Sequence, residues 1–228
     1  MAYAKEGASV VINYPNEQEE SNARNILNEL TAFSENSMIF MADVSSSNEV
    51  KKMIETVDAK YKSIDILVNN AGIATSSPIH EMPDKMWTEL LSIHLNGTFF
   101  CTRECLNIMY KNNYGRIINT ASQLAYKGSA GFAHYTAAKG AIISFTRSLS
   151  LEIGTRNIRA NCVAPGATMT RMLADVPKEI LDDIKQSIPK GTIANVNEIV
   201  PSYVFLASSD GDHYVGQTIS PNGGDIFL

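Results

Sequence analysis

The sequence predicts an α/β fold, a doubly wound parallel sheet in a single domain. Apolar runs of strand length alternate with longer segments of helical periodicity, which is the pattern of parallel strands with helices on both faces. Several runs end in short polar or glycine-containing turns, as strands do where an open sheet binds ligands. The 228 residues, 44% of them hydrophobic, are enough for one substantial core.

The predicted strands are short, apolar and bounded by turn residues, and the predicted helices lie between them. Strands are expected at 9–14, 37–42, 64–69, 115–120, 158–163 and 217–220. Helices are expected at 16–32, 48–61, 83–111, 133–153, 178–186 and 196–206. We find no repeat, low-complexity stretch or linker, so we expect one domain over residues 1–228.

Composition and charge exclude several classes of function. The basic residues are scattered and the net charge is −5, so we expect no nucleic-acid partner. No apolar run approaches the ~20 residues that span a bilayer, and the first residues have no signal-peptide pattern, so we expect a cytoplasmic protein without a membrane partner. The three cysteines form no Cys-x-x-Cys pair, which predicts no metal site.

A serine, a tyrosine and a lysine carry the chemistry. Tyr135 and Lys139 are four residues apart in a predicted helix and share one face, and Ser122 lies thirteen residues before the tyrosine, just past a predicted strand. A phenol has a pKa of roughly 10, and a neighbouring cation favours its phenolate. The pattern therefore predicts proton transfer to or from a carbonyl or alcohol oxygen.

Two further turns flank these residues in order. Asn69-Asn70-Ala71-Gly72 closes one predicted strand, and Pro165-Gly166 closes another. With Ser122, Tyr135 and Lys139 between them, residues from about 4 to 225 resemble the short-chain dehydrogenase/reductase family, nearest to its 3-oxoacyl-acyl-carrier-protein reductases. The resemblance implies a Rossmann-type sheet and an enzyme that interconverts a ketone and a secondary alcohol with a nicotinamide cofactor.

The resemblance also implies roles for single residues. Tyr135 would donate the proton to the carbonyl oxygen, Lys139 would lower the pKa of Tyr135 and hold the nicotinamide ribose, and Ser122 would hydrogen-bond the substrate oxygen. The residues expected to contact the cofactor are Asn13, Tyr14, Asp43, Val44, Asn70, Ala71, Gly72, Tyr135, Lys139, Pro165, Gly166 and Thr168.

The beginning of the chain departs from the family. A dinucleotide site of this type needs a first strand and a glycine-rich turn, whereas residues 1–8 resemble the end of the helix that follows that turn. The chain is therefore expected to be N-terminally incomplete. Either its start is placed too late, which we favour, or it is a natural truncation that leaves backbone groups at a central gap unpaired.

A second departure lies in the long central helix. The family usually has an asparagine there, which kinks the helix around a water that passes protons to the lysine; this sequence has His94. Asn96 is two residues away and points elsewhere on a helix, so it is not expected to substitute. His94 is either a proton relay or a packed helix residue.

Cofactor and substrate preferences rest on fewer residues. The expected strand at 9–14 matches the family's second strand, and no acidic residue stands at its end, 12–16, so NADP(H) is preferred and NAD(H) remains possible. The segment 169–184 matches the family's substrate lid, and its apolar residues Met169, Met172, Leu173 and Val176 favour an acyl chain.

A 3-oxoacyl thioester on an acyl carrier protein, as in fatty acid biosynthesis, is accordingly the predicted substrate. Glucose, polyol or other alcohol oxidation is the alternative within the enzyme class, and a non-catalytic binding or subunit relative is the alternative outside it. The family packs its two long central helices between subunits, so we expect a homodimer or homotetramer through 83–111 and 133–153.

Overall fold

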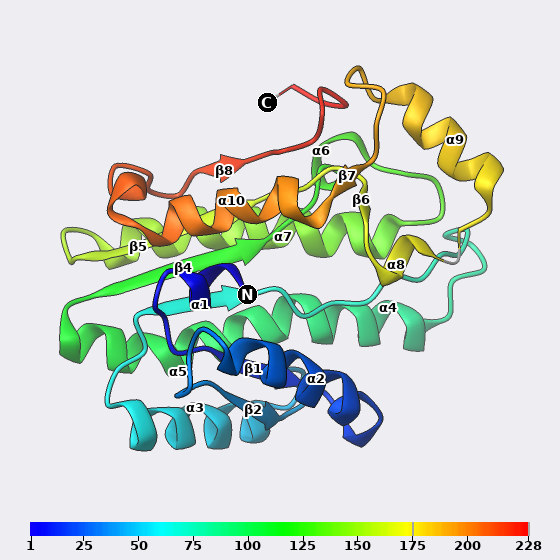
Figure 1. Ribbon diagram of the computed structural model, residues 1–228. Helices are drawn as coiled ribbons and strands as arrows, with labels where there is room; N and C mark the ends of the chain where they lie inside the picture. The colour runs from blue at the N-terminus through cyan, green and yellow to red at the C-terminus, as the bar shows by residue number, and fades with distance from the viewer. Residues whose placement is uncertain (175, 228) are drawn as a thin grey trace.

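A computed structural model describes residues 1–174 and 176–227. Helices cover a mostly parallel sheet, and every strand pairing in the described chain is parallel, which confirms the predicted α/β class (Figure 1). The strands are β1 (Val11–Tyr14), β2 (Met38–Met41), β3 (Ile66–Asn69), β4 (Gly115–Thr120), β5 (Ile158–Val163), β6 (Thr168–Met169), β7 (Ala194–Asn195) and β8 (Thr218–Ile219).

All six predicted helical segments contain helix. The longer helices are α2 (Glu20–Thr31), α3 (Ser47–Tyr61), α4 (Asp84–Leu91), α5 (Gly97–Asn112), α7 (Ala133–Ile153), α9 (Lys178–Ser187) and α10 (Val196–Ala207). Single turns occur at α1 (Ala2–Lys5), α6 (Leu124–Lys127) and α8 (Arg171–Ala174), with 3-10 turns at Glu17–Glu19 and Ser209–Gly211.

The long helix predicted at 83–111 is interrupted. A π-helical turn at Ser92–Asn96 separates α4 from α5, and the Thr98 hydroxyl donates a hydrogen bond to the His94 carbonyl oxygen at 2.7 Å. Such single-turn bulges often lie at functional sites. Here the bulge carries His94 into the protein, where it is 2% exposed, while Asn96 stays at the surface.

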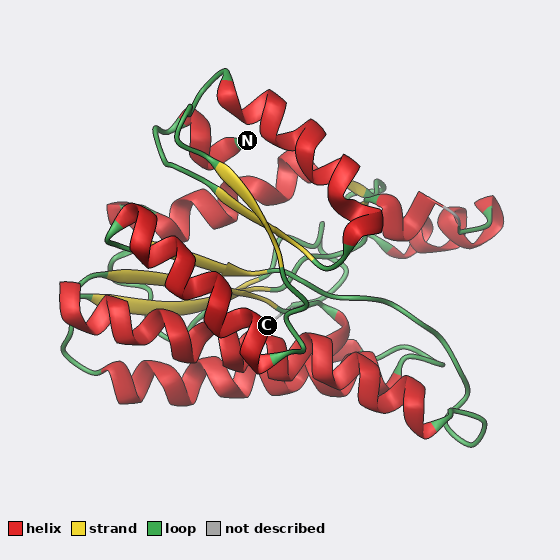
Figure 2. Cartoon of the chain, turned by 90° about the horizontal axis from the view of Figure 1, so that it is seen from below, coloured by secondary structure: helices red, strands yellow, loops and turns green. Residues whose placement is uncertain are grey.

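The sheet is divided into two main parts. In the described part of the chain β1 pairs only with β2, while β3, β4, β5 and β8 form a separate four-stranded sheet in that order. Figure 2 shows the two strands apart from the four. The second edges of β1 and β3 pair with no strand among the described residues. All four residues of β3 are accordingly only half-buried, whereas Gly115 to Asn119 of β4 are fully buried.

Helices on both faces of the four-stranded sheet enclose the core. α5 and α7 pack on one face of this sheet, and α3 packs against α5. α10 packs on the other face. The core includes the free thiols of Cys101, Cys105 and Cys162, all buried. No helix of the described chain is both long and apolar enough to cross a membrane.

Candidate active site

The structure brings the three predicted catalytic residues together at the carboxyl ends of β4 and β5. Tyr135 lies in the first turn of α7 and Lys139 one turn later, and Ser122 follows β4 by two residues. The Lys139 ammonium lies 5.7 Å from the centre of the Tyr135 ring. The Ser122 hydroxyl is near enough to the phenol to lower the pKa of Tyr135. Ser122 and Lys139 are buried, and Tyr135 is half-buried.

Lys139 is held by the backbone. Its Nζ donates a hydrogen bond of 2.6 Å to the carbonyl oxygen of Thr120, the last residue of β4. Burial disfavours the charged form and lowers the pKa of Lys139 from 10.5 to about 8. The ammonium therefore remains charged at neutral pH, and it loses its proton at a pH well below that of an ordinary lysine.

The pKa of Tyr135 differs from the sequence-based expectation. Lys139 was expected to lower it, but burial raises the pKa of Tyr135, and only the hydrogen bond from Ser122 opposes that effect. The physical reason is that the phenol is largely withdrawn from water while the ammonium is directed to the Thr120 carbonyl. Tyr135 thus holds its proton at neutral pH.

Thr120 is a residue that the sequence reasoning missed. Besides accepting from Lys139, it donates through Oγ1 to Asn70 Oδ1 at 3.2 Å, and the same hydroxyl lies 2.9 Å from that of Tyr203 in α10. The ends of β3 and β4 are therefore tied together beside the predicted catalytic residues. The sequence did hold one signal for Thr120: it is a polar residue that ends the strand leading to Ser122.

His94 faces the turn after β3. Its Nε2 lies 3.0 Å from the amide nitrogen of Ile73 and 2.8 Å from the Ile73 carbonyl oxygen, and its ring meets that of Tyr135 edge-on at 5.5 Å. A Cβ added at Gly72 would lie 2.3 Å from His94 Cε1, so only glycine fits there. Burial, followed by the charge of Lys139, lowers the pKa of His94 to about 4.

A second buried histidine, His134, directly precedes Tyr135. Its Nε2 lies 2.8 Å from the hydroxyl oxygen of Thr75, and burial lowers its pKa. Sequence reasoning missed this residue as well, because its partner is 59 residues away.

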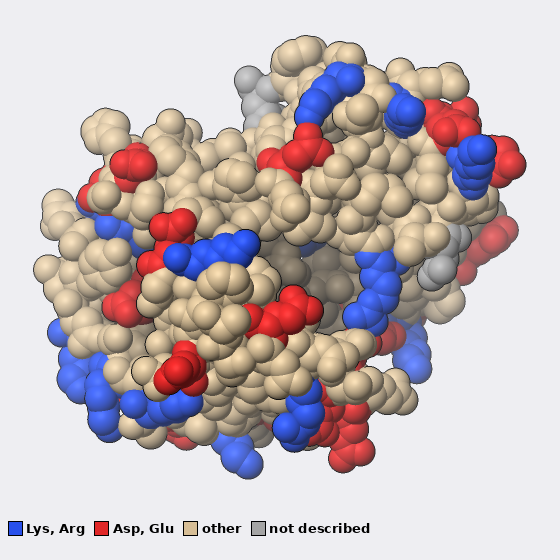
Figure 3. Space-filling view, viewed as in Figure 1, with Lys and Arg blue, Asp and Glu red and all other residues tan. Residues whose placement is uncertain are grey.

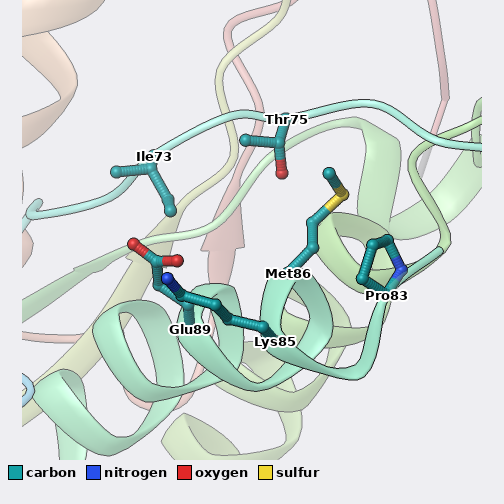
Figure 4. Close-up of a pocket in the computed structure, with 6 residues that line it drawn as sticks. All are labelled: Ile73, Thr75, Pro83, Lys85, Met86 and Glu89. Atoms are coloured by element: carbon teal, nitrogen blue, oxygen red, sulfur yellow. The ribbon is translucent and has the colours of Figure 1, made fainter.

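Beside the contact between His134 and Thr75 is a cavity of about 280 Å³ between α4 and the segment after β3 (Figure 4). Its lining residues are Ile73, Thr75, Pro83, Lys85, Met86 and Glu89.

Known proteins resemble this sequence over most of its length. The sequence model of a family described as Enoyl-(Acyl carrier protein) reductase matches residues 1–225. The 3-oxoacyl-[acyl-carrier-protein] reductase FabG of Staphylococcus aureus is 33% identical over 97% of this chain and 89% of its own length. The chain belongs to the short-chain dehydrogenase/reductase family. As a family member it is an NAD(P)-dependent oxidoreductase.

Two other relatives differ in the names they carry. Nodulation protein G of a Rhizobium species is 39% identical over 82% of this chain and 76% of its own length. The (2S)-[(R)-hydroxy(phenyl)methyl]succinyl-CoA dehydrogenase subunit BbsD of Thauera aromatica is 33% identical, covering 98% of this chain and 89% of its own length.

The residues after β3 and β5 fit the nicotinamide end of the family's cofactor. The turn Asn70–Gly72 follows β3 and is exposed to solvent. Thr120 links it to Lys139, because Thr120 bonds both Asn70 and Lys139. Gly166 and Thr168 follow β5, where the Thr168 hydroxyl donates to the Gly166 carbonyl at 2.9 Å. A Cβ at Gly166 would lie 2.7 Å from Asn222 Cα, so this turn also needs glycine. Pro165 precedes it and is half-buried.

The residues expected at the adenine end are bonded within the protein. The Asn13 amide donates to the Ala42 carbonyl at 2.8 Å, and the Asp43 carboxylate accepts from both the amide and the hydroxyl of Ser45 at 2.8 Å. Val44 is buried against Gly97, and Tyr14 ends β1 half-buried. No glycine-rich turn lies between a strand and a helix here in the described residues, so the chain's fit to the cofactor rests on its nicotinamide end.

Proposed function

We propose that this enzyme reduces a 3-oxoacyl thioester, carried on an acyl carrier protein or coenzyme A, to the 3-hydroxyacyl thioester with NADPH. The observation that carries the proposal is the convergence of Ser122, Tyr135 and Lys139 beside the exposed Asn70–Gly72 turn. The named reaction of the Staphylococcus aureus relative supports this substrate class.

The side chains suit reduction. A bound nicotinamide supplies the hydride. Tyr135 holds its proton at neutral pH because partial withdrawal from water raises its pKa, so its phenol is available to donate to the carbonyl oxygen as that oxygen gains charge. The Ser122 hydroxyl stabilises the same oxygen, and the Lys139 ammonium stabilises the phenolate that forms. Tyr135 then regains a proton from water before the next turnover.

NADPH is preferred over NADH in this proposal. The end of β1 has no acidic side chain that would repel a 2′-phosphate, and the Asn13 amide is bonded to the Ala42 carbonyl just after β2.

Two basic residues near the site are already paired with carboxylates: Lys127 with Asp225, and Arg171 with Glu19. Neither is therefore a ready-made site for the phosphates of a carrier.

The test is turnover of a short 3-oxoacyl-coenzyme A by wild-type protein and by Tyr135→Phe, followed as oxidation of NADPH. Tyr135→Phe keeps the ring and removes the proton, so we expect turnover to fall by at least about a thousandfold while cofactor binding is retained. Thr56→Val serves as the control, because its hydroxyl bonds only within α3. Equal turnover by Tyr135→Phe would contradict the assignment.

The same assay separates the competing substrate. Glucose and polyols are offered with NADP⁺ or NAD⁺. Faster oxidation of these alcohols than reduction of the thioester would replace the proposed function with that of a polyol dehydrogenase.

The cytoplasm is the proposed location, as expected for an enzyme of acyl-thioester metabolism.

A further inference from the structure

The segment 73–77, which connects the Asn70–Gly72 turn to α4, is fastened at three points. The Ile73 amide and carbonyl both lie within hydrogen-bond distance of His94 Nε2, which bonds one of them in each tautomer. The Thr75 hydroxyl contacts His134, and the Ser77 amide donates to the Gly131 carbonyl at 3.0 Å. The first two anchors are buried histidines from different elements. They stand on either side of the catalytic tyrosine, one in ring contact with it and the other next to it in the chain.

Each histidine uses a single ring nitrogen. In both rings Nε2 makes the contact, while Nδ1 is buried without a hydrogen-bond partner among the described residues. An imidazolium has two N–H donors, and a buried donor without an acceptor is costly. The surroundings therefore favour the neutral ring in both cases. The ionisable groups near His94 are Lys139, Tyr135 and His134, and none of them carries a negative charge at neutral pH that would favour the charged ring.

The fastened segment is also one wall of the cavity against α4, whose lining residues Ile73 and Thr75 are the two that contact the histidines. Ile73 and Thr75 face α4 across it, where Met86 and the other lining residues complete the pocket (Figure 4). A shift of the segment would change both the width of this pocket and the position of the adjoining Gly72 backbone. The histidines touch the wall rather than the cavity, since neither lines it.

We propose that His94 and His134 are positioning residues that clamp the segment Ile73–Thr75 beside Tyr135 and thereby set which ketone chains enter the cavity against α4. The clamp follows from the hydrogen-bond geometry alone; its consequence for acyl thioesters rests on the proposed function. In this arrangement His94 acts on the wall of the site through Ile73, rather than on the protons of the reaction.

The first test breaks the Thr75–His134 contact from each side. Thr75→Val, His134→Leu and the double variant are compared with wild type for the hydrogen exchange of peptides that cover 73–77. We expect exchange to rise about tenfold in each single variant and no further in the double variant, because all three lack the same bond. Thr56→Val, which loses a hydroxyl bond within α3, should leave this segment unchanged. Unchanged protection, or strictly additive effects, would refute the clamp.

The second test asks what the clamp does in turnover. For Thr75→Val and His94→Leu we expect KM for a long-chain 3-oxoacyl-coenzyme A to change about tenfold relative to a short-chain one, with kcat changed less than threefold. His94→Asn, which keeps a polar group able to bond Ile73, should recover most of the difference. A fall in kcat with KM unchanged, or a shifted pH–rate profile in His94→Asn, would instead identify His94 as part of the proton path and overturn its positioning role.

The two tests fail separately. If wild-type protein turns over no 3-oxoacyl thioester, the proposed function is wrong, while hydrogen exchange of 73–77 still decides the clamp. Should His94→Leu not fold, Thr75→Val and His94→Asn provide the same comparison, since Thr75 is only half-buried and asparagine is smaller than the histidine it replaces.

Discussion

At the scale of single residues, burial controls the ionisation of the site more than charge does. Withdrawal from water lowers the pKa of Lys139 to about 8 and that of His94 to about 4, and it raises the pKa of Tyr135. The spacing of Tyr135 and Lys139 predicted their proximity but gave the wrong sign for the tyrosine. The sequence shows which groups lie on one helix face, whereas the depth at which they lie depends on the strands packed against that face.

The low pKa of His94 predicts that the protein loses stability as the pH falls. Its pKa is about 4 in the folded protein and about 6.5 in the unfolded chain, so the unfolded chain binds more protons as the pH falls between these values. Acidification from pH 7 to pH 5 should therefore remove about 2 kcal/mol of unfolding free energy through this residue. Urea denaturation at both pH values is the measurement. His94→Asn should show a smaller loss by that amount, and an equal loss in both proteins would contradict the prediction.

At the scale of elements, the divided sheet is the feature that most affects cofactor binding. Within residues 1–174 and 176–227, β1 and β3 each leave an edge unpaired, and unpaired edges are a liability that folded proteins usually cover. We propose that one further parallel strand, encoded in frame before Met1 and followed by a glycine-rich turn, pairs with both edges. The half-burial of β3 beside a fully buried β4 supports this proposal.

The corresponding experiment compares the 228-residue chain with a chain extended by the preceding in-frame codons. We expect the extended chain to bind NADPH at least about tenfold more tightly in a fluorescence titration, because the turn supplies backbone donors to the pyrophosphate. NADH is titrated in parallel and should bind more weakly. Equal NADPH affinity for the two chains, or a stop codon directly before Met1, would rule the proposal out.

At the scale of the whole molecule, the surface combines mixed charge with exposed apolar groups. Acidic and basic side chains are interspersed around a central recess on the face shown in Figure 3. Large apolar side chains are exposed on the two long central helices: Phe99 of α5 is 42% exposed and Leu151 of α7 is 85% exposed. Exposed apolar groups of this size often mark contacts between chains. We propose that α5 and α7 pack between subunits of a homodimer or homotetramer.

Light scattering tests this association. Wild-type protein should have the mass of two or four chains, and Phe99→Glu combined with Leu151→Glu should reduce it, because burying two carboxylates in an apolar contact is unfavourable. Ile26→Glu introduces the same charge at an exposed residue of α2 and should keep the wild-type mass. A monomeric wild-type protein would contradict the proposal.

The sequence by itself determined the alternation of strands and helices, the family, and the identity of Ser122, Tyr135 and Lys139. These features are local or have fixed spacing, so hydrophobic periodicity and short motifs are enough to predict them. Only the tertiary structure decided that Thr120 holds Lys139, that His94 and His134 fasten the segment after β3, and that burial sets the protonation of Tyr135. Those features join residues 19 to 59 positions apart, and their distance and depth exist only once the helices have packed on the sheet.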